Sequence, residues 1–156
     1  MKIDRFDRQI LQLLQQEGRI SNQELADRIG LSPSPCLRRV RALEESGYIA
    51  GYGAHLNSKM LGLSLMALIH ISMDQHTPER FNHFEAAISE IAEITECLLI
   101  TGQSADYQLK AVVKDMDAYQ DLLLNRITRI SGVSGVHSSF VLRQTINRKT
   151  VPTTTQ

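Results

Sequence analysis

The sequence predicts an α+β protein in two parts, an N-terminal helix-turn-helix domain of three helices followed by a ferredoxin-like βαββαβ domain. In residues 1–47, apolar side chains recur at intervals of three and four positions, which is the pattern of helices with one buried side. In residues 63–147, the apolar period changes repeatedly between two, typical of strands, and 3.6, typical of helices. The glycine-containing residues 48–62 separate the two patterns, so we expect a hinge strand and linker there.

The first helix is predicted to begin after Asp4, whose carboxylate can cap it, and to end at Gly18. Its apolar stripe consists of Phe6, Ile10, Leu13 and Leu14. Ser21 and Glu24 form the capping-box pattern that begins a second helix, in which each side chain bonds the other residue's backbone amide. This helix buries Leu25, Ala26 and Ile29, and it stops at Gly30, which can adopt the positive φ of a tight turn.

The third helix begins at Ser32 and Pro33, a hydroxyl cap followed by proline at the first helical position. Its apolar side consists of Cys36, Leu37, Val40 and Leu43. Because Cys36 lies on that side, we expect it to pack in the core rather than to sense redox state.

The third helix is also the candidate DNA reader, because residues 32–43 contain three arginines and no acidic residue. Two short helices joined by a turn, the second of them basic, form the helix-turn-helix layout. Hydroxyls and the helix N-terminus would contact phosphates, and arginines would contact phosphates or guanine edges. The predicted DNA-binding residues are Ser32, Ser34, Pro35, Arg38, Arg39 and Arg41.

The same arginines also allow structural interpretations. Arg38 and Arg41 share one side of the helix, whereas Arg39 points elsewhere, so we expect at least one arginine to be structural or to pair with Glu44 or Glu45. The structural alternative is a three-helix bundle in which the arginines only form a solvated surface.

The second part is expected to alternate strands and helices. A first strand places Leu63, Leu65, Ala67, Ile69, Ile71 and Met73 on one face. A helix beginning at Thr77 and Pro78 follows, with an apolar side made of Phe81, Phe84, Ile88 and Ile91. Residues 95–101 form a second strand, and residues 102–106 form a turn.

A third strand, a second helix and a fourth strand complete the order. The third strand has Tyr107, Leu109, Ala111 and Val113 on one face. Asp115 caps a helix with Met116, Tyr119, Leu123, Ile127 and Ile130 on its apolar side. The fourth strand alternates through Val136, Ser138, Phe140 and Leu142, and residues 148–156 are expected to form a disordered tail. Helices would cover one face of this sheet only, and a second copy of the domain is the simplest cover for the other face.

Composition narrows the function classes. The formal net charge is zero, so the case for DNA rests on the local basic helix. The N-terminus lacks the apolar stretch of a signal peptide, and the longest apolar run is too short to span a membrane, so we expect a cytoplasmic protein. The two cysteines and five histidines have no disulfide or metal-site spacing, so no metal or cofactor is predicted. No activated nucleophile, catalytic carboxylate pair or phosphate loop is present, so we do not expect an enzyme.

Several motifs resemble those of one family of regulators. They are Asp7 with Ile10-Leu11 and Leu14, Leu31-Ser32-Pro33-Ser34-Pro35-Cys36, Arg39-Val40-Arg41-Ala42-Leu43-Glu44, Gly47-Tyr48-Ile49-Ala50-Gly51-Tyr52, Gly102-Gln103-Ser104-Ala105-Asp106-Tyr107, Asp115-Met116 and Gly132-Val133. With these residues the chain resembles the Lrp/AsnC family of leucine- and asparagine-responsive transcription regulators, from about Asp4 to Ile146. The resemblance implies a homodimer that binds operator DNA and assembles into octamers or similar rings, together with a free amino acid as effector.

The resemblance also implies an effector site near the turn of residues 102–107. The expected effector-binding residues are Gly102, Gln103, Ser104, Asp106, Tyr107 and Ser138. Backbone amides around Gly102 would bind the α-carboxylate and Asp106 the α-ammonium, whereas the plain alternative is that both residues only shape the turn. The family often carries a further charged residue where this chain has Gln103 and Ser104, which leaves the effector's identity open. A DNA-organising protein without an effector is the alternative function.

Overall fold

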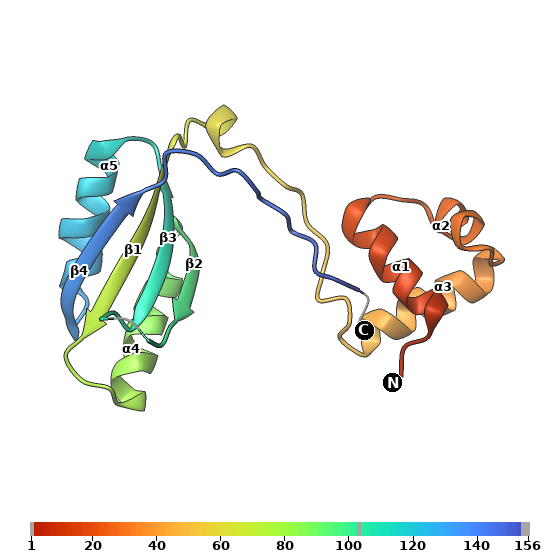
Figure 1. Cartoon of the computed structure of the whole chain (residues 1–156), viewed down its shortest axis with the longest axis horizontal. Coiled ribbons are helices and arrows are strands. Elements are labelled where there is room, and N and C mark those ends of the chain that lie inside the picture. The colour runs from red at the N-terminus through yellow and green to blue at the C-terminus, as the bar shows by residue number, and fades with distance from the viewer. Residues whose placement is uncertain (1, 103, 154–156) are drawn as a thin grey trace. The chain divides into compact units, whose positions relative to one another are not determined.

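The structure is a computed structural model that describes residues 2–102 and 104–153 (Figure 1). The chain divides into two compact units, one made of Met1–His55 with Ile146–Gln156 and the other of Leu56–Thr145. The C-terminal segment therefore belongs with the N-terminal helices, which the sequence did not predict. Residues 48–55 contain no strand, in contrast to the hinge strand that we expected.

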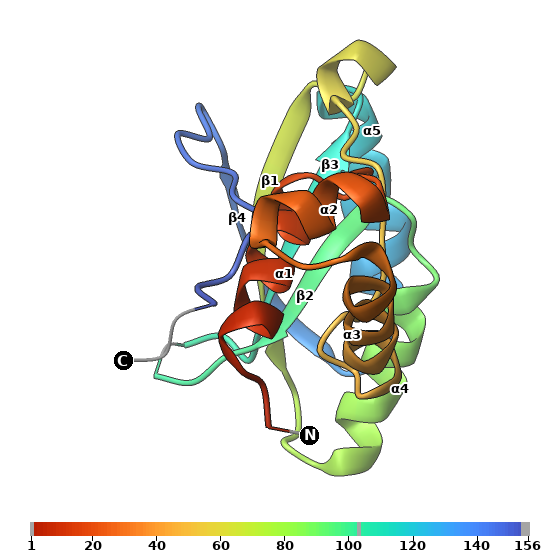
Figure 2. The ribbon, with the colours of Figure 1, turned by 90° about the vertical axis from the view of Figure 1, so that its right-hand side faces the viewer.

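The first unit contains α1 (Arg5–Gln16), α2 (Asn22–Ile29) and α3 (Pro33–Glu45), shown in Figure 2. Asp4 caps α1 in a reciprocal capping box with Asp7 that the sequence analysis missed. Ser21 caps α2 by accepting the Glu24 N–H at 3.1 Å. The other half of that predicted box does not form, because the Glu24 carboxylate instead lies 3.7 Å from Arg28 in a salt bridge.

The core of this unit is formed where the three helices meet. Its buried members are Ile10, Leu25, Ala26, Ile29, Cys36 and Leu43. Cys36 is fully buried, and burial raises the pKa of its thiol, as the packing prediction requires. Leu37 was placed on the apolar side but is 39% exposed, since the inward positions of α3 follow the spacing of residues 36, 40 and 43.

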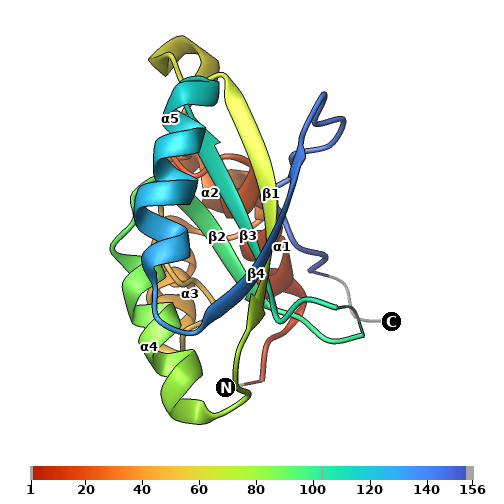
Figure 3. The same ribbon diagram turned by 90° about the vertical axis from the view of Figure 1, so that its left-hand side faces the viewer.

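The second unit contains β1 (Leu65–Met73), α4 (Pro78–Ser89), β2 (Ile94–Leu99), β3 (Tyr107–Val113), α5 (Met116–Asp121) and β4 (Val133–Phe140) (Figure 3). A π-helical turn at Leu122–Arg126 and a 3-10 turn at Ile127–Arg129 extend α5. The strand order is β2-β3-β1-β4 and all three pairings are antiparallel, which is the ferredoxin-like arrangement.

Helices α4 and α5 cover one face of this sheet. They bury alternate side chains of the two central strands, namely Ala67, Ile69, Ile71, Met73, Tyr107, Leu109, Ala111 and Val113. The intervening residues face the other side, where His70 of β1 lies opposite His137 of β4 and Gln108 of β3. Within the described part of this unit, no helix packs over that second face.

Candidate DNA-binding helix and effector turn

One side of α3 is exposed and basic. Ser34, Arg38 and Arg41 are all exposed, and their spacing of four and three residues aligns them along the helix. Neither Arg38 nor Arg41 forms an ion pair with any described residue, and the first turn of α3 contains no acidic side chain. This side therefore presents unpaired positive charge to solvent, which is the requirement for contacting phosphates.

The start of α3 has an unusual set of donors. Ser32 occupies the N-cap position, and its hydroxyl makes no capping hydrogen bond, so it is available to a ligand. Helix N-termini bind anions through backbone N–H groups, but Pro33 and Pro35 have none. The Ser34 N–H is therefore the amide that this first turn offers, and Pro35 contributes shape rather than a hydrogen bond.

The turn before α3 is fixed by backbone and side-chain hydrogen bonds. Gly30 ends α2 with a φ of 73°, and the Leu31 N–H bonds the Ala26 carbonyl at 2.9 Å. The Asn22 side chain donates to the Pro33 carbonyl at 2.9 Å, which ties the first turn of α3 to α2. These bonds hold the two helices of the motif in one arrangement.

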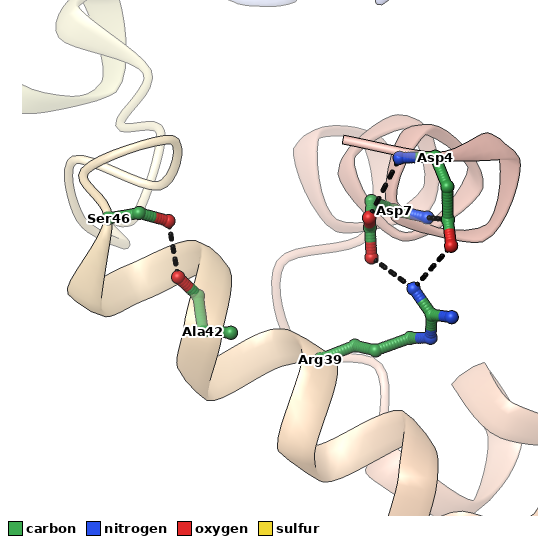
Figure 4. Close-up of polar contacts among 5 residues, drawn as sticks. All are labelled: Asp4, Asp7, Arg39, Ala42 and Ser46. Atoms are coloured by element: carbon green, nitrogen blue, oxygen red, sulfur yellow. Dashed lines mark hydrogen bonds and ion pairs between the residues drawn. The ribbon is translucent and has the colours of Figure 1, made fainter. Parts of the chain in front are cut away.

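Arg39 does not lie on the exposed side of α3. Its guanidinium donates to Asp4 and to Asp7 at the start of α1, both at 2.8 Å (Figure 4). The Asp7 side chain is only 3% exposed, and its second oxygen accepts the Asp4 N–H at 2.9 Å. The guanidinium also lies 5.5 Å from the centre of the Phe6 ring, within cation–π range. We call Asp4, Asp7 and Arg39 the α1–α3 latch.

The latch shifts the pKa values of Arg39 and Asp4 in the directions expected for a charged network. The hydrogen bond to Asp7, followed by that to Asp4, raises the pKa of Arg39. The pKa of Asp4 is lowered, mainly because its carboxylate accepts the Asp7 backbone N–H. We therefore assign Arg39 to helix packing and leave it out of the DNA-contact set. Arg39 is thus the structural arginine that the sequence led us to expect, with Asp4 and Asp7 as its partners rather than Glu44 or Glu45. Glu44 accepts the Tyr52 hydroxyl at 2.9 Å.

The candidate effector turn connects β2 to β3. Gly102 has a φ of 83°, a conformation that other residues rarely adopt, and a Cβ there would meet nothing within 4 Å. The Ser104 carbonyl accepts the Ser72 hydroxyl at 2.9 Å, so the turn is tied to the end of β1. Gln103 lies outside the described residues.

Asp106 holds this turn in place. One carboxylate oxygen accepts the Met73 N–H at 2.7 Å, and the other lies 2.7 Å from the His76 ring. The Asp106 backbone also bonds the Ile71 carbonyl and the Ile100 N–H, each at 2.8 Å. The interpretation of Asp106 as a structural residue of the turn therefore has direct support, and it need not be the partner of an ammonium group.

Tyr107 and Ser138 do not point toward the turn. The Tyr107 side chain lies on the helix-covered face, where its ring contacts Phe84 at 4.6 Å between centroids and its hydroxyl donates to Glu85 at 2.7 Å. Burial, and then the hydrogen bond to Glu85, raises the pKa of Tyr107. The Ser138 hydroxyl is hydrogen-bonded to the Tyr119 hydroxyl on α5. Of the predicted effector set, the structure therefore brings together Gly102, Ser104 and Asp106, and it places Tyr107 and Ser138 in the packing between sheet and helices.

Both parts of the chain match models of known protein families. Residues 66–151 match the Lrp/AsnC ligand binding domain, and residues 3–50 match a winged helix-turn-helix DNA-binding domain. The chain belongs to the Lrp/AsnC family. The fold class and the family that the sequence predicted are thus confirmed, and the protein is a helix-turn-helix DNA-binding regulator with a ligand-binding domain.

Individual Lrp/AsnC relatives are similar over nearly the whole chain. The leucine-responsive regulatory protein of Salmonella typhimurium is 46% identical over 142 residues, which are 91% of this chain and 86% of the relative. A Neisseria meningitidis transcriptional regulator in complex with L-Met superposes with a TM-score of 0.92 at 36% identity, covering 97% of each chain. Escherichia coli AsnC superposes with a TM-score of 0.88 at 28% identity, covering 97% of this chain and all of AsnC.

Among the described helices, none has the length and apolar character needed to cross a bilayer. The described residues also contain no group of three or more histidine, cysteine, aspartate or glutamate side chains placed to hold a metal ion.

Proposed function

We propose that this Lrp/AsnC regulator contacts DNA through Ser32, Ser34, Arg38 and Arg41 of α3, with Pro35 shaping the first turn. The observation that carries the proposal is the exposed, acid-free side of α3, on which neither arginine has an ion-pair partner among the residues that the structure describes. Arg39 has the same charge but is engaged in the latch, so it serves as an internal comparison. The expected partner is an operator duplex, whose major groove admits a helix of this kind.

We propose further that the turn of residues 102–106 binds a free amino acid. Gly102 allows backbone amides to approach an α-carboxylate closely, and Asp106 fixes the turn on which those amides lie. The complex of the Neisseria regulator with L-Met supports this class of ligand. The proposal includes no metal or other cofactor. We also propose that the protein acts in the cytoplasm, as expected for a transcription regulator.

We propose that the uncovered face of the sheet pairs with a second copy of the chain, giving a dimer that assembles into larger rings. Exposed sheet faces with apolar side chains are commonly covered by association. Here the face carries Met66 and Leu68, each half-buried, beside the polar pair His70 and Gln108. A dimer would place two recognition helices on one operator. Light scattering that gives the 17.5 kDa mass of one chain at micromolar concentration would contradict the proposal.

The DNA proposal is tested by measuring the affinity and its salt dependence for Arg38→Met and for Arg41→Met. Each lost phosphate or base contact should weaken binding by about 1–3 kcal/mol, and each lost phosphate contact should lower the log–log salt slope by about 0.9. Arg19→Met is the matched control, because Arg19 is exposed in the same unit but lies outside α3. Equal affinities for all three variants and the wild type would refute the assignment.

The effector proposal is tested by following the melting temperature during titration with each common amino acid. A ligand that binds the folded state raises the melting temperature by mass action. If none of the amino acids raises it, the protein acts on DNA without an effector, and the proposal is wrong.

A further inference from the structure

One side of α1 carries a hydrogen-bonded segment of the protein's own C-terminus. Arg8, Leu11 and Gln15 follow one another at spacings of three and four residues, so they line a single side of the helix. The described C-terminal residues 146–153 belong to the same compact unit as α1. The sequence predicted a disordered tail from residue 148, whereas three hydrogen bonds join its described residues to α1.

These hydrogen bonds are all made to the backbone of the tail. The Gln15 side chain accepts the Val151 N–H and donates to the Val151 carbonyl, both at 2.9 Å. Arg8 donates to the Thr153 carbonyl at 2.8 Å. A carboxamide that pairs with both backbone groups of one residue imitates an adjacent β-strand, so it selects an extended segment rather than particular side chains.

The segment also borders a cavity of about 390 Å³ in the same unit. Its walls come from three parts of the chain: Ile3, Leu11 and Leu14 at α1, the linker residues 48–52, and residues 151–153 of the tail. The tail and the linker therefore share one apolar surface of α1. Removing the tail would expose that surface and the linker backbone to water.

We propose that this side of α1 is a docking site for the protein's own C-terminal segment, residues 151–153, and that the docked segment clamps linker residues 48–52 to the DNA-binding unit. The chain leaves this unit through the linker and returns to it after β4, so two chain segments join the units. A DNA-binding unit held by two segments has less freedom than one held by a single linker. That restriction favours simultaneous binding of two half-sites, a consequence that rests on the proposed dimer.

Docking itself is tested by cross-linking, independently of DNA binding. Leu11→Cys and Val151→Cys are combined in a Cys97→Ser background and treated with a short bis-maleimide; Cys36 is buried. Leu11 and Val151 line the same cavity, and neither substitution removes the Gln15 or Arg8 side chain or the Val151 backbone groups that form the hydrogen bonds. We expect a cross-link within one chain, which keeps the mobility of a single chain on a denaturing gel. The control pairs Val151→Cys with Gln12→Cys, an exposed position about 100° further round the helix, and should react several-fold more slowly.

Two results would overturn the docking proposal. A covalent dimer would mean that the tail of a second copy occupies the site. Equal slow reaction of the Leu11 and Gln12 pairs would mean that the tail is not docked.

The consequence for DNA is tested with two duplexes, one carrying both half-sites selected from random DNA by the wild-type protein and one with a single half-site. Deletion of residues 148–156 and, separately, Gln15→Ala should weaken binding to the paired duplex by about tenfold and leave the single half-site unaffected. Gln16→Ala is the matched control. An equal loss of affinity for both duplexes would show that the tail acts on the DNA contact or on folding. Unchanged affinity for both would show that the clamp does not restrict the unit. Either result would refute the proposed consequence for DNA binding.

Discussion

Replacing Arg39 by methionine breaks the α1–α3 latch without removing a proposed DNA contact, so it tests the latch by itself. The substitution keeps a long apolar stem but leaves the Asp7 carboxylate, at 3% exposure, without its charged donor. Losing a hydrogen bond to a charged group costs about 1.5–3 kcal/mol. Because Arg39 is 32% and Asp4 49% exposed, solvent takes over part of the interaction, and we expect a loss of about 2 kcal/mol in the free energy of unfolding of the first unit. A domain of this size would melt roughly 8–16 °C lower.

Hydrogen exchange is the appropriate assay, because it reports each unit separately in the full chain. Amides of α1 and α3 should lose protection in Arg39→Met, while amides of β1 and β3 serve as the internal reference. Arg38→Met is the matched control: it removes the same charge one residue away, where no described partner exists, and should change stability by less than about 0.5 kcal/mol. Asp7→Asn added to Arg39→Met should recover part of the loss, because it removes the unpaired buried charge. If Arg38→Met and Arg39→Met lose protection equally, the latch does not hold the unit together.

Three further predictions use other residues. The lowered pKa of Asp4 means that its contribution to stability is complete above the ordinary carboxyl pKa and is lost as the pH falls through the folded value. The free energy of unfolding of Asp4→Asn in urea should therefore depend less on pH than that of the wild type as the pH falls below the ordinary carboxyl pKa. Asp106→Ala should destabilise the second unit by about 1–3 kcal/mol in urea, since the Met73 N–H loses its acceptor, and an unchanged midpoint would remove the structural assignment. Gly102→Val should cost about 1–2 kcal/mol from backbone strain alone, because a side chain there meets no neighbour; a larger loss by urea unfolding would mean that the turn is packed more tightly than the structure shows.

Local patterns predicted the elements of the fold well where one period dominated. The alternation of apolar residues predicted β1 and β3 and which of their faces is buried. A sheet that is covered on one side requires apolar side chains at every second position. The π-helical turn after α5 left no comparable signal, since the same apolar residues fit an ordinary helix. The docked tail was missed for a different reason. Its hydrogen bonds use backbone groups, so the threonine-rich sequence looked like solvent-exposed coil.

The candidate sites show a corresponding limit. Sequence spacing correctly separated Arg39 from the side shared by Arg38 and Arg41, because rotation per residue is a property of the helix itself. It could not choose the partner of Arg39, since Asp7 comes from another helix. The spacing of Asp4 and Asp7 at the start of α1 was a usable signal, for two acids three apart form a capping pattern. For Tyr107 and Ser138, strand register decided the outcome by turning both side chains toward the helices.

The separation of roles among the three arginines has a physical consequence for how the protein releases DNA. Salt weakens exposed charge pairs strongly and sheltered pairs much less. Arg38 and Arg41 lie on the exposed side of α3, so added salt would compete directly with the phosphate contacts that we propose for them. Arg39 is bonded to a carboxylate that solvent barely reaches, so the latch keeps most of its strength under the same conditions. The recognition helix can therefore lose DNA while its position against α1 is retained, and rebinding requires no refolding of the unit.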